Sequence, residues 1–116
     1  MMSENLEKAK TQMRRGVLEL CILSILAERE AYSTDIISRL ESSELIVVEG
    51  TVYPLLTRLK NAGLLEYRWE ESSAGPPRKY YNITGEGRYF LRGLLDTWNQ
   101  LVQAVENSTK NITTNE

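Results

Sequence analysis

The chain has 116 residues, one cysteine, no histidine and a formal net charge of −2. Its length predicts one compact unit with room for a helical layer and a small sheet. Because it has no histidine, the commonest general base and metal ligand is missing, and a lone cysteine forms neither a disulfide framework nor a zinc site. We therefore expect no enzymatic activity, no cofactor and no metal.

The N-terminal segment "MMSENLEKAKTQMRR" has no apolar stretch of the kind that signal peptides carry. The longest apolar run is far shorter than a membrane span. We expect a cytoplasmic protein without a membrane partner, in which Cys21 is a small core residue.

Residues 3–29 predict a long helix capped by Ser3. Its first turns are polar and carry only Leu6, Ala9 and Met13 along one stripe, whereas residues 17–26 are apolar nearly all round. A sparse stripe joined to a fully apolar segment indicates an arm that leaves its own core and packs on something else. A frayed N-terminal extension is the alternative.

A second helix is expected from an N-cap at Ser33, followed by a connector in which Leu45–Val48 forms a short extended piece and adds a third strand. A third helix is expected from Gly50 or Thr51, because apolar residues then recur every three or four positions. Pro54 falls in its first turn, and Gly63 supplies its stop.

The segment "LLEYRWE" alternates apolar and charged residues, which predicts a strand with Trp69 packed in a small sheet. "SSAGPP" is expected to be a turn, and "RKYYNIT" a returning strand with Arg78 and Lys79 at the tip. Helices followed by a basic hairpin predict an α+β fold, a winged helix-turn-helix with a two- or three-stranded wing sheet.

Thr84 is expected to cap a last helix, in which apolar residues recur at alternating steps of three and four. The domain organisation is then a winged helix-turn-helix over 1–83, a dimerisation helix over 84–108 and a disordered tail over 109–116. A homodimer would bury this stripe together with the N-terminal arm, although closure of the protomer's own core is the alternative. The expected interface residues are Leu6, Met13, Leu91, Leu94, Leu95, Trp98, Leu101, Val102 and Val105.

Residues Gly50 to Arg92 contain seven basic and four acidic side chains, a local charge of +3 in an acidic chain. A helix that follows a helix and a turn can enter the major groove of DNA, and a wing can meet the flanking backbone. The candidate DNA-binding residues are Thr51, Tyr53, Arg58, Lys60, Arg78 and Lys79. For Arg58 and Lys60 a solvated helix face is the alternative. The competing class is a winged-helix protein–protein interaction module that binds no DNA.

The blocks "GVLELCILSIL", "TVYPLLTRLKNAGLLEYRW" and "GPPRKYYNITGEGR" resemble the PadR family of transcriptional regulators, from about Arg15 to Arg88. The single C-terminal helix resembles the small PadR subgroup. The resemblance implies a homodimeric winged-helix repressor that dimerises through its first and last helices. It also implies DNA contacts at Thr51, Tyr53, Arg58, Arg78 and Lys79, and two-fold symmetry then predicts a pseudo-palindromic operator.

The resemblance also bears on Trp98, which lies on the stripe of the last helix. In some small PadR-like regulators a tryptophan at the matching place lines an apolar opening at the dimer interface, where a small aromatic effector stacks. Trp98 is accordingly either an effector-binding residue or a plain aromatic of the dimer core.

Overall fold

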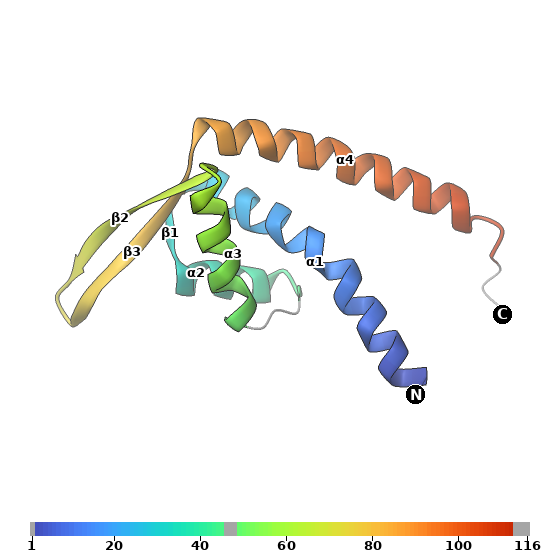
Figure 1. Ribbon diagram of the computed structural model, residues 1–116, viewed down its shortest axis with the longest axis horizontal. Helices are drawn as coiled ribbons and strands as arrows, with labels where there is room; N and C mark the ends of the chain where they lie inside the picture. The colour runs from blue at the N-terminus through green and yellow to red at the C-terminus, as the bar shows by residue number, and fades with distance from the viewer. Residues whose placement is uncertain (1, 46–48, 113–116) are drawn as a thin grey trace.

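The computed structural model describes residues 2–45 and 49–112, which form four helices and a three-stranded sheet (Figure 1). The elements are α1 (Met2–Glu28), β1 (Ala31–Tyr32), α2 (Ser33–Ser42), α3 (Glu49–Asn61), β2 (Leu65–Ser72), β3 (Gly75–Ile83) and α4 (Gly85–Thr109). The antiparallel sheet has the order β1-β3-β2. This arrangement confirms the predicted α+β winged helix-turn-helix with a long C-terminal helix.

The core lies where the second half of α1 meets α2, α3 and the base of the sheet. On α3 the buried residues are Val52, Leu56 and Leu59, each at most 1% exposed. Their spacing of four and three places them on one face of the helix, so the opposite face remains open to solvent. Pro54 lies on that open face, inside the helix but near its start.

The end of α3 is closed by a glycine, as predicted. Gly63 has a φ of +80°, a left-handed conformation that other residues rarely adopt. The N–H of Leu64 donates to the carbonyl of Leu59 at 3.0 Å, and the N–H of Gly63 donates to that of Lys60 at 3.0 Å. These two bonds form a Schellman motif, which satisfies the last carbonyls of the helix and turns the chain into β2.

One junction joins this turn to the start of α4. Thr84 is the N-cap of α4, as predicted, and its hydroxyl accepts from the N–H of Gly87 at 2.9 Å. The same hydroxyl donates to the carbonyl of Gly63 at 2.7 Å, while the N–H of Thr84 donates to that of Leu64 at 3.1 Å. The end of α3, both ends of the hairpin and the start of α4 are therefore held together.

The third strand differs from the prediction. It is β1, whose Ala31 and Tyr32 pair with Tyr81 and Tyr80 of β3. Leu45 lies in no strand, and the rest of the expected Leu45–Val48 piece falls outside the described residues. Ser33 is the first residue of α2 and not its N-cap. The N-cap is Tyr32, because β1 runs directly into the helix. Asp35 accepts from the Tyr32 N–H at 3.4 Å.

The hairpin turn is also shorter than predicted. Only Ser73 and Ala74 lie between the strands, because Ser72 pairs with Gly75 and the prolines belong to β3. Between the pairs Glu70–Arg78 and Ser72–Gly75, β2 has one residue and β3 has two, Pro76 and Pro77. A bulge of this kind accommodates residues that cannot donate to the ladder, which explains how two prolines fit inside a strand.

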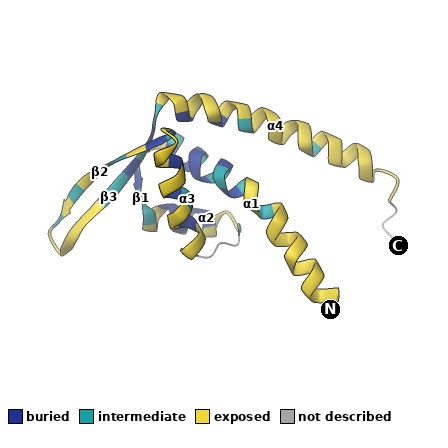
Figure 2. Cartoon of the chain, in the orientation of Figure 1, coloured by how far each residue is buried: buried dark blue, intermediate teal, exposed yellow. Residues whose placement is uncertain are grey.

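The molecule is extended for its size. Its radius of gyration is 17.1 Å, whereas a compact domain of this length has a radius of about 13 Å. Its accessible surface is 8581 Å², against about 6,500 Å² for a typical monomer of this mass. The excess comes from the N-terminal half of α1 and the C-terminal half of α4, which project as exposed helices (Figure 2).

The start of α4 belongs to the protomer's own core. Leu91 is buried there and Leu94 packs against it, whereas Leu95, Trp98, Leu101 and Val105 are exposed. The stripe of α4 thus first closes the protomer and then continues into solvent. The helix reaches Thr109, one residue beyond its predicted end, and a short turn follows; residues 113–116 lie outside the described part of the chain.

The close approach at the α4 junction gives a stability prediction. A Cβ at Gly87 would stand 2.1 Å from the Leu64 carbonyl oxygen, whereas one at Gly93 would meet nothing within 4 Å. We expect Gly87→Ala to lower the free energy of unfolding by about 1–3 kcal/mol, since the backbone must shift. Gly93→Ala, on an exposed face of the same helix, should be stabilising by about 0.5–1 kcal/mol. Thermal and urea denaturation of both variants measure the difference, and equal stability would contradict the steric role of Gly87.

Candidate nucleic-acid interface

One face of the hairpin runs from the core out to solvent in three cross-strand pairs. Leu65 and Ile83 are buried, Tyr67 and Tyr81 lie above them, and Trp69 and Lys79 end the series. Because side chains alternate along a strand, these six residues share the face that turns toward α3. The apolar end anchors the hairpin, and the outer end projects an indole and an ammonium group beside α3.

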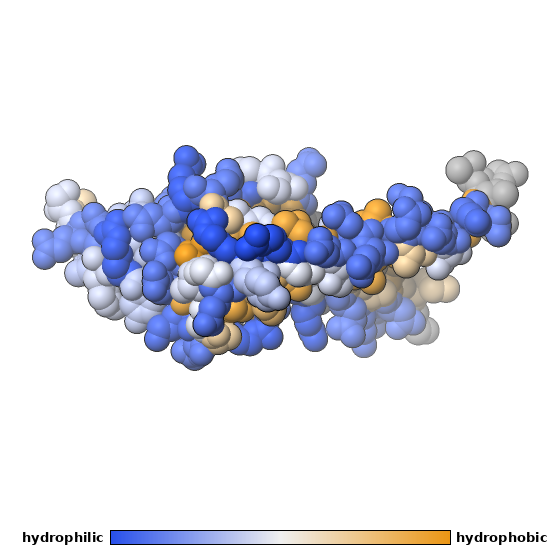
Figure 3. Space-filling model, turned by 90° about the horizontal axis from the view of Figure 1, so that it is seen from above, coloured by the Kyte–Doolittle hydropathy of each residue, from blue (hydrophilic) through white to orange (hydrophobic). Residues whose placement is uncertain are grey.

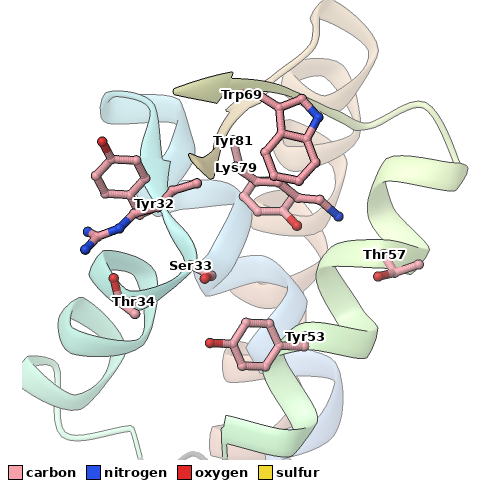
Figure 4. A pocket seen from close by; sticks show the side chains of 9 residues that line it. Tyr32, Ser33, Thr34, Tyr53, Thr57, Trp69, Lys79 and Tyr81 are labelled. Carbon is pink, nitrogen blue, oxygen red and sulfur yellow. The ribbon is translucent and has the colours of Figure 1, made fainter. Parts of the chain in front are cut away.

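A concave surface lies between this face, α3 and the start of α2 (Figure 4). Its volume is about 490 Å³. It offers hydroxyl groups, aromatic rings and two cations, and none of the described residues that line it is acidic. The lining residues are Tyr32, Ser33, Thr34, Tyr53, Thr57, Trp69, Arg78, Lys79 and Tyr81. We call this surface the wing groove.

The open face of α3 supplies one wall of the wing groove. Thr57 follows Tyr53 by four residues, so both side chains lie on the same side of the helix. Thr51 is exposed two residues before Tyr53 and so lies on another side of α3, and Lys60 places its ammonium 5.6 Å from the Tyr67 ring centroid. Of the predicted DNA-binding residues, Tyr53, Arg78 and Lys79 meet in the groove, whereas Thr51, Arg58 and Lys60 lie outside it.

Arg58 points to the other side of α3. Its guanidinium lies 2.8 Å from a carboxylate oxygen of Glu19 on α1, and both groups are partly exposed. An exposed ion pair of this kind contributes about 0–1 kcal/mol, so a competing anion can replace the carboxylate at small cost. The alternative drawn from the sequence, that Arg58 lies on a solvated helix face, therefore describes this residue only in part, because Arg58 has an ion-pair partner within the protomer.

Arg78 and Lys79 do not lie at the hairpin tip, which corrects the prediction. They pair with Glu70 and Trp69, three or more residues from the Ser73–Ala74 turn. The misplacement follows directly from the prolines, which read as turn residues in the sequence but occupy the bulge of β3. Lys79 thus sits on the strand face beside the groove, whereas Arg78, the preceding residue of β3, points to the opposite face and borders the groove next to Tyr32.

The cations of the groove rest on aromatic rings. Lys79 Nζ lies 4.6 Å from the Tyr67 centroid and 5.6 Å from that of Trp69. The Arg78 guanidinium lies 5.2 Å from the Tyr32 ring. In the part of the chain that the structure describes, neither cation has a carboxylate within ion-pairing distance. Cation–π contacts orient a cation but leave its charge uncompensated.

Arg68, on the opposite face of the hairpin, behaves differently. It donates to Glu30 at 2.7 Å and also to Glu70, and its guanidinium lies 4.8 Å from the Tyr80 ring. The hydrogen bond from Arg68 lowers the pKa of the Glu30 carboxyl below its ordinary value. The acidic side chains near the sheet therefore neutralise Arg68 and leave the cations of the wing groove available.

Sequence reasoning missed several members of the groove. Thr57 could have been found from its spacing to Tyr53 on the helix. The expectation that Trp69 packs in the sheet is wrong for most of its surface, since the side chain is 62% exposed. Ser33 and Thr34 carried no signal beyond helix capping, because the groove forms only when α2 packs near the hairpin.

The described residues give no support for other kinds of site. They contain no group of three or more histidine, cysteine, aspartate or glutamate side chains that could hold a metal ion. Burial raises the pKa of the Cys21 thiol, which makes a reactive thiolate scarce at neutral pH. None of the helices in these ranges is long and apolar enough to span a membrane.

A family model, the transcriptional regulator PadR-like family, matches residues 22–93, which include α2, α3, the hairpin and the start of α4. The chain belongs to the PadR-like family. Membership of this family supports a role as a DNA-binding regulator, and the matched region includes the residues that line the wing groove.

Solved structures extend this PadR-like assignment to nearly the whole chain. A PadR-like transcription factor from Bacteroides fragilis is 54% identical, with 86% of this chain and 97% of that one covered and a TM-score of 0.73. A PadR family transcriptional regulator from Eggerthella lenta is 31% identical, with coverage of 95% and 96% and a TM-score of 0.86. A PadR-like regulator from Bacillus cereus is 37% identical, with coverage of 86% and 98% and a TM-score of 0.75.

The Arg58–Glu19 pair gives a prediction for this PadR-like protein. Glu19→Gln should raise DNA affinity about two- to fivefold at low salt, because Arg58 then turns to phosphate without giving up an ion pair. Glu106→Gln removes the same charge from the distal part of α4 and is the matched control. Fluorescence anisotropy on a labelled duplex measures both. Equal gains in the two variants would indicate a long-range charge effect and contradict competition at Arg58.

Proposed function

We propose that this PadR-like protein is a dimeric, sequence-specific repressor of transcription rather than an enzyme. It inserts α3 into the major groove of DNA and lays the hairpin along the flanking backbone. The observation that carries this proposal is the wing groove, a concave surface whose described lining residues include two cations and no acidic side chain, in a chain whose net charge is negative. Local positive charge beside an exposed helix is the electrostatic footprint of a DNA-binding domain.

In this arrangement α3 supplies base readout. Thr51, Tyr53 and Thr57 are exposed; Tyr53 and Thr57 share the side that lines the wing groove, whereas Thr51 lies on the side of Arg58. Their hydroxyls can donate to base edges or phosphates, and the threonine methyls can contact thymine. Arg58 points toward α1 and Lys60 toward the hairpin. They are suited to the phosphates on the two sides of the groove.

Arg78 and Lys79 then hold the backbone beside the recognition helix. Contacts to phosphate fix the register of a protein on DNA without reading its sequence. The Tyr67 ring keeps Lys79 on the strand face that turns toward α3, and the Tyr32 ring keeps Arg78 beside the start of α2. The strands of the hairpin rather than its tip therefore meet the duplex.

The dimer is proposed from the projecting helices. Leu6 and Met13 on α1 and Trp98, Leu101 and Val105 on α4 are all 42% or more exposed. Apolar patches interrupt the hydrophilic surface on the α4 side of the molecule (Figure 3). The surface excess over a typical monomer, about 2,000 Å², is of the size that a stable interface removes. A two-fold dimer would read a pseudo-palindrome with half-sites roughly 34–36 Å or a multiple apart.

An effector site at Trp98 is a further part of the proposal. The indole is 42% exposed on the stripe that the dimer would cover, so a flat aromatic compound could stack on it between protomers. Such a ligand would act on DNA binding by changing how the two protomers are spaced.

The repressor proposal predicts specific, salt-dependent binding. A duplex selected from a random library should bind about 10³-fold or more tightly than a scrambled duplex. Lys79→Met should lower the slope of log K against log salt by about 0.9 for each phosphate that the side chain no longer neutralises. Arg92→Met, an exposed cation on α4, is the matched control. Anisotropy titrations at several salt concentrations measure these slopes.

Two results would contradict this assignment. An unchanged slope for Lys79→Met removes that residue from the phosphate contacts. Failure of the wild type to select or bind any duplex at low salt favours the competing module that binds proteins instead of DNA.

The dimer proposal has its own test. Trp98→Ala combined with Leu101→Ala should shift a dimer toward monomer in sedimentation velocity, because two large apolar side chains are removed from the proposed interface. Tyr89→Ala is the control, since Tyr89 is 78% exposed on α4 but lies two residues from Leu91 and so on another face. A double variant that stays fully dimeric would place the interface elsewhere.

A further inference from the structure

The exposed indole at the outer end of the hairpin needs an explanation. Trp69 is 62% exposed, although it shares a strand face with residues that pack into the core. Tryptophan carries a large apolar surface, and leaving most of it in water is unfavourable unless something covers it. The described part of the protomer does not provide that cover, since most of the indole remains in solvent although Tyr53 and Thr57 of α3 line the same groove.

The ring is nevertheless held in position. It meets the Tyr67 ring edge-on, with centroids 6.0 Å apart and planes at 86°. Its cross-strand partner is Lys79, whose ammonium lies 5.6 Å from the indole centroid. Figure 4 shows Trp69 standing over the groove, facing the side chains of Tyr53 and Thr57 on α3. An exposed aromatic side chain that is fixed at both its edge and its face is suited to contact a partner.

The chemistry of the surroundings specifies that partner. An apolar plane adjoins an uncompensated cation, and hydroxyl donors line the remainder of the wing groove. A nucleotide of duplex DNA offers the complementary set, since its deoxyribose and base edge are apolar and its phosphate is anionic. The open shape of the groove fits a continuous backbone that passes through it. An acidic lining would repel such a strand, and the described residues that line the groove include no acidic one.

We propose that Trp69 is a DNA-contacting residue that packs its indole against the deoxyribose and base edge of the strand beside the major groove. Lys79, held next to the ring, binds the adjoining phosphate. The proposal rests on the DNA-binding function proposed above and adds an apolar contact to it. This contact supplies affinity that does not depend on salt, because no counterion is released when apolar surfaces meet.

The chain itself provides a direct reporter. It has two tryptophans, Trp69 and Trp98, on the hairpin and on α4. Trp98→Phe leaves Trp69 as the sole indole and keeps an aromatic ring in the proposed dimer stripe, whereas Trp69→Phe leaves Trp98. Addition of the library-selected duplex should reduce acrylamide quenching of Trp69 at least twofold. It should leave the quenching of Trp98 unchanged, because that indole lies on another element.

An affinity series separates a direct DNA contact from a structural role. Trp69→Ala should weaken binding to the selected duplex about tenfold, the effect expected when one aromatic ring is removed from a nucleic-acid interface. The salt slope should stay at the wild-type value, in contrast to Lys79→Met, since no charge is removed. Trp69→Phe should recover part of the affinity. Thermal denaturation should show the three variants equally stable, because exposed side chains contribute little to folding.

The outcomes distinguish this proposal from the broader function. If the wild type binds the selected duplex but Trp69 stays equally quenchable and Trp69→Ala keeps its affinity, the Trp69 contact is overturned and the repressor proposal stands. If the wild type binds no duplex, both fail. Reduced quenching with a tenfold weaker affinity at an unchanged salt slope supports the contact.

Discussion

The arrangement of the molecule depends on the polar junction around Thr84. Its hydroxyl and N–H reach the carbonyls of Gly63 and Leu64, and the same hydroxyl caps α4 through Gly87. The absence of a side chain at Gly87 lets α4 approach the Leu64 carbonyl closely. Since α3 ends, the hairpin starts and closes, and α4 begins at this place, one set of hydrogen bonds orients α3, the hairpin and the projecting helix relative to one another.

The positive charge at the wing groove arises from which cations are paired with carboxylates, and not from an excess of basic residues in the chain. The chain is acidic overall, yet carboxylates contact cations away from the wing groove: Glu19 pairs with Arg58, Glu28 with Arg39, and Glu30 with Arg68. Arg78 and Lys79 rest on tyrosine and tryptophan rings instead. A local surface of uncompensated positive charge therefore exists on a protein whose net charge predicts little affinity for nucleic acid.

α1 connects the two proposed interfaces. Its second half is buried in the core and carries Glu19, the partner of Arg58 on α3. Its first half projects with α4 and exposes Leu6 and Met13. A change in how two protomers pack would move one end of a helix whose other end holds a cation of the recognition helix. This continuity gives dimer geometry a physical route to DNA binding.

The sequence by itself determined the local elements. Periodicity defined the core face of α3, an apolar segment located the buried half of α1, Gly63 and Thr84 marked helix ends, and the motif blocks carried the PadR-like resemblance, because each of these signals is short-range chemistry. Tertiary structure decided the rest. Packing placed Pro76 and Pro77 in a bulge, made Ala31 and Tyr32 the third strand, paired Arg58 with α1, and left Trp69 exposed over α3. Those outcomes depend on which distant segments meet, and alternation along one strand does not say how much of each side chain a neighbouring element covers.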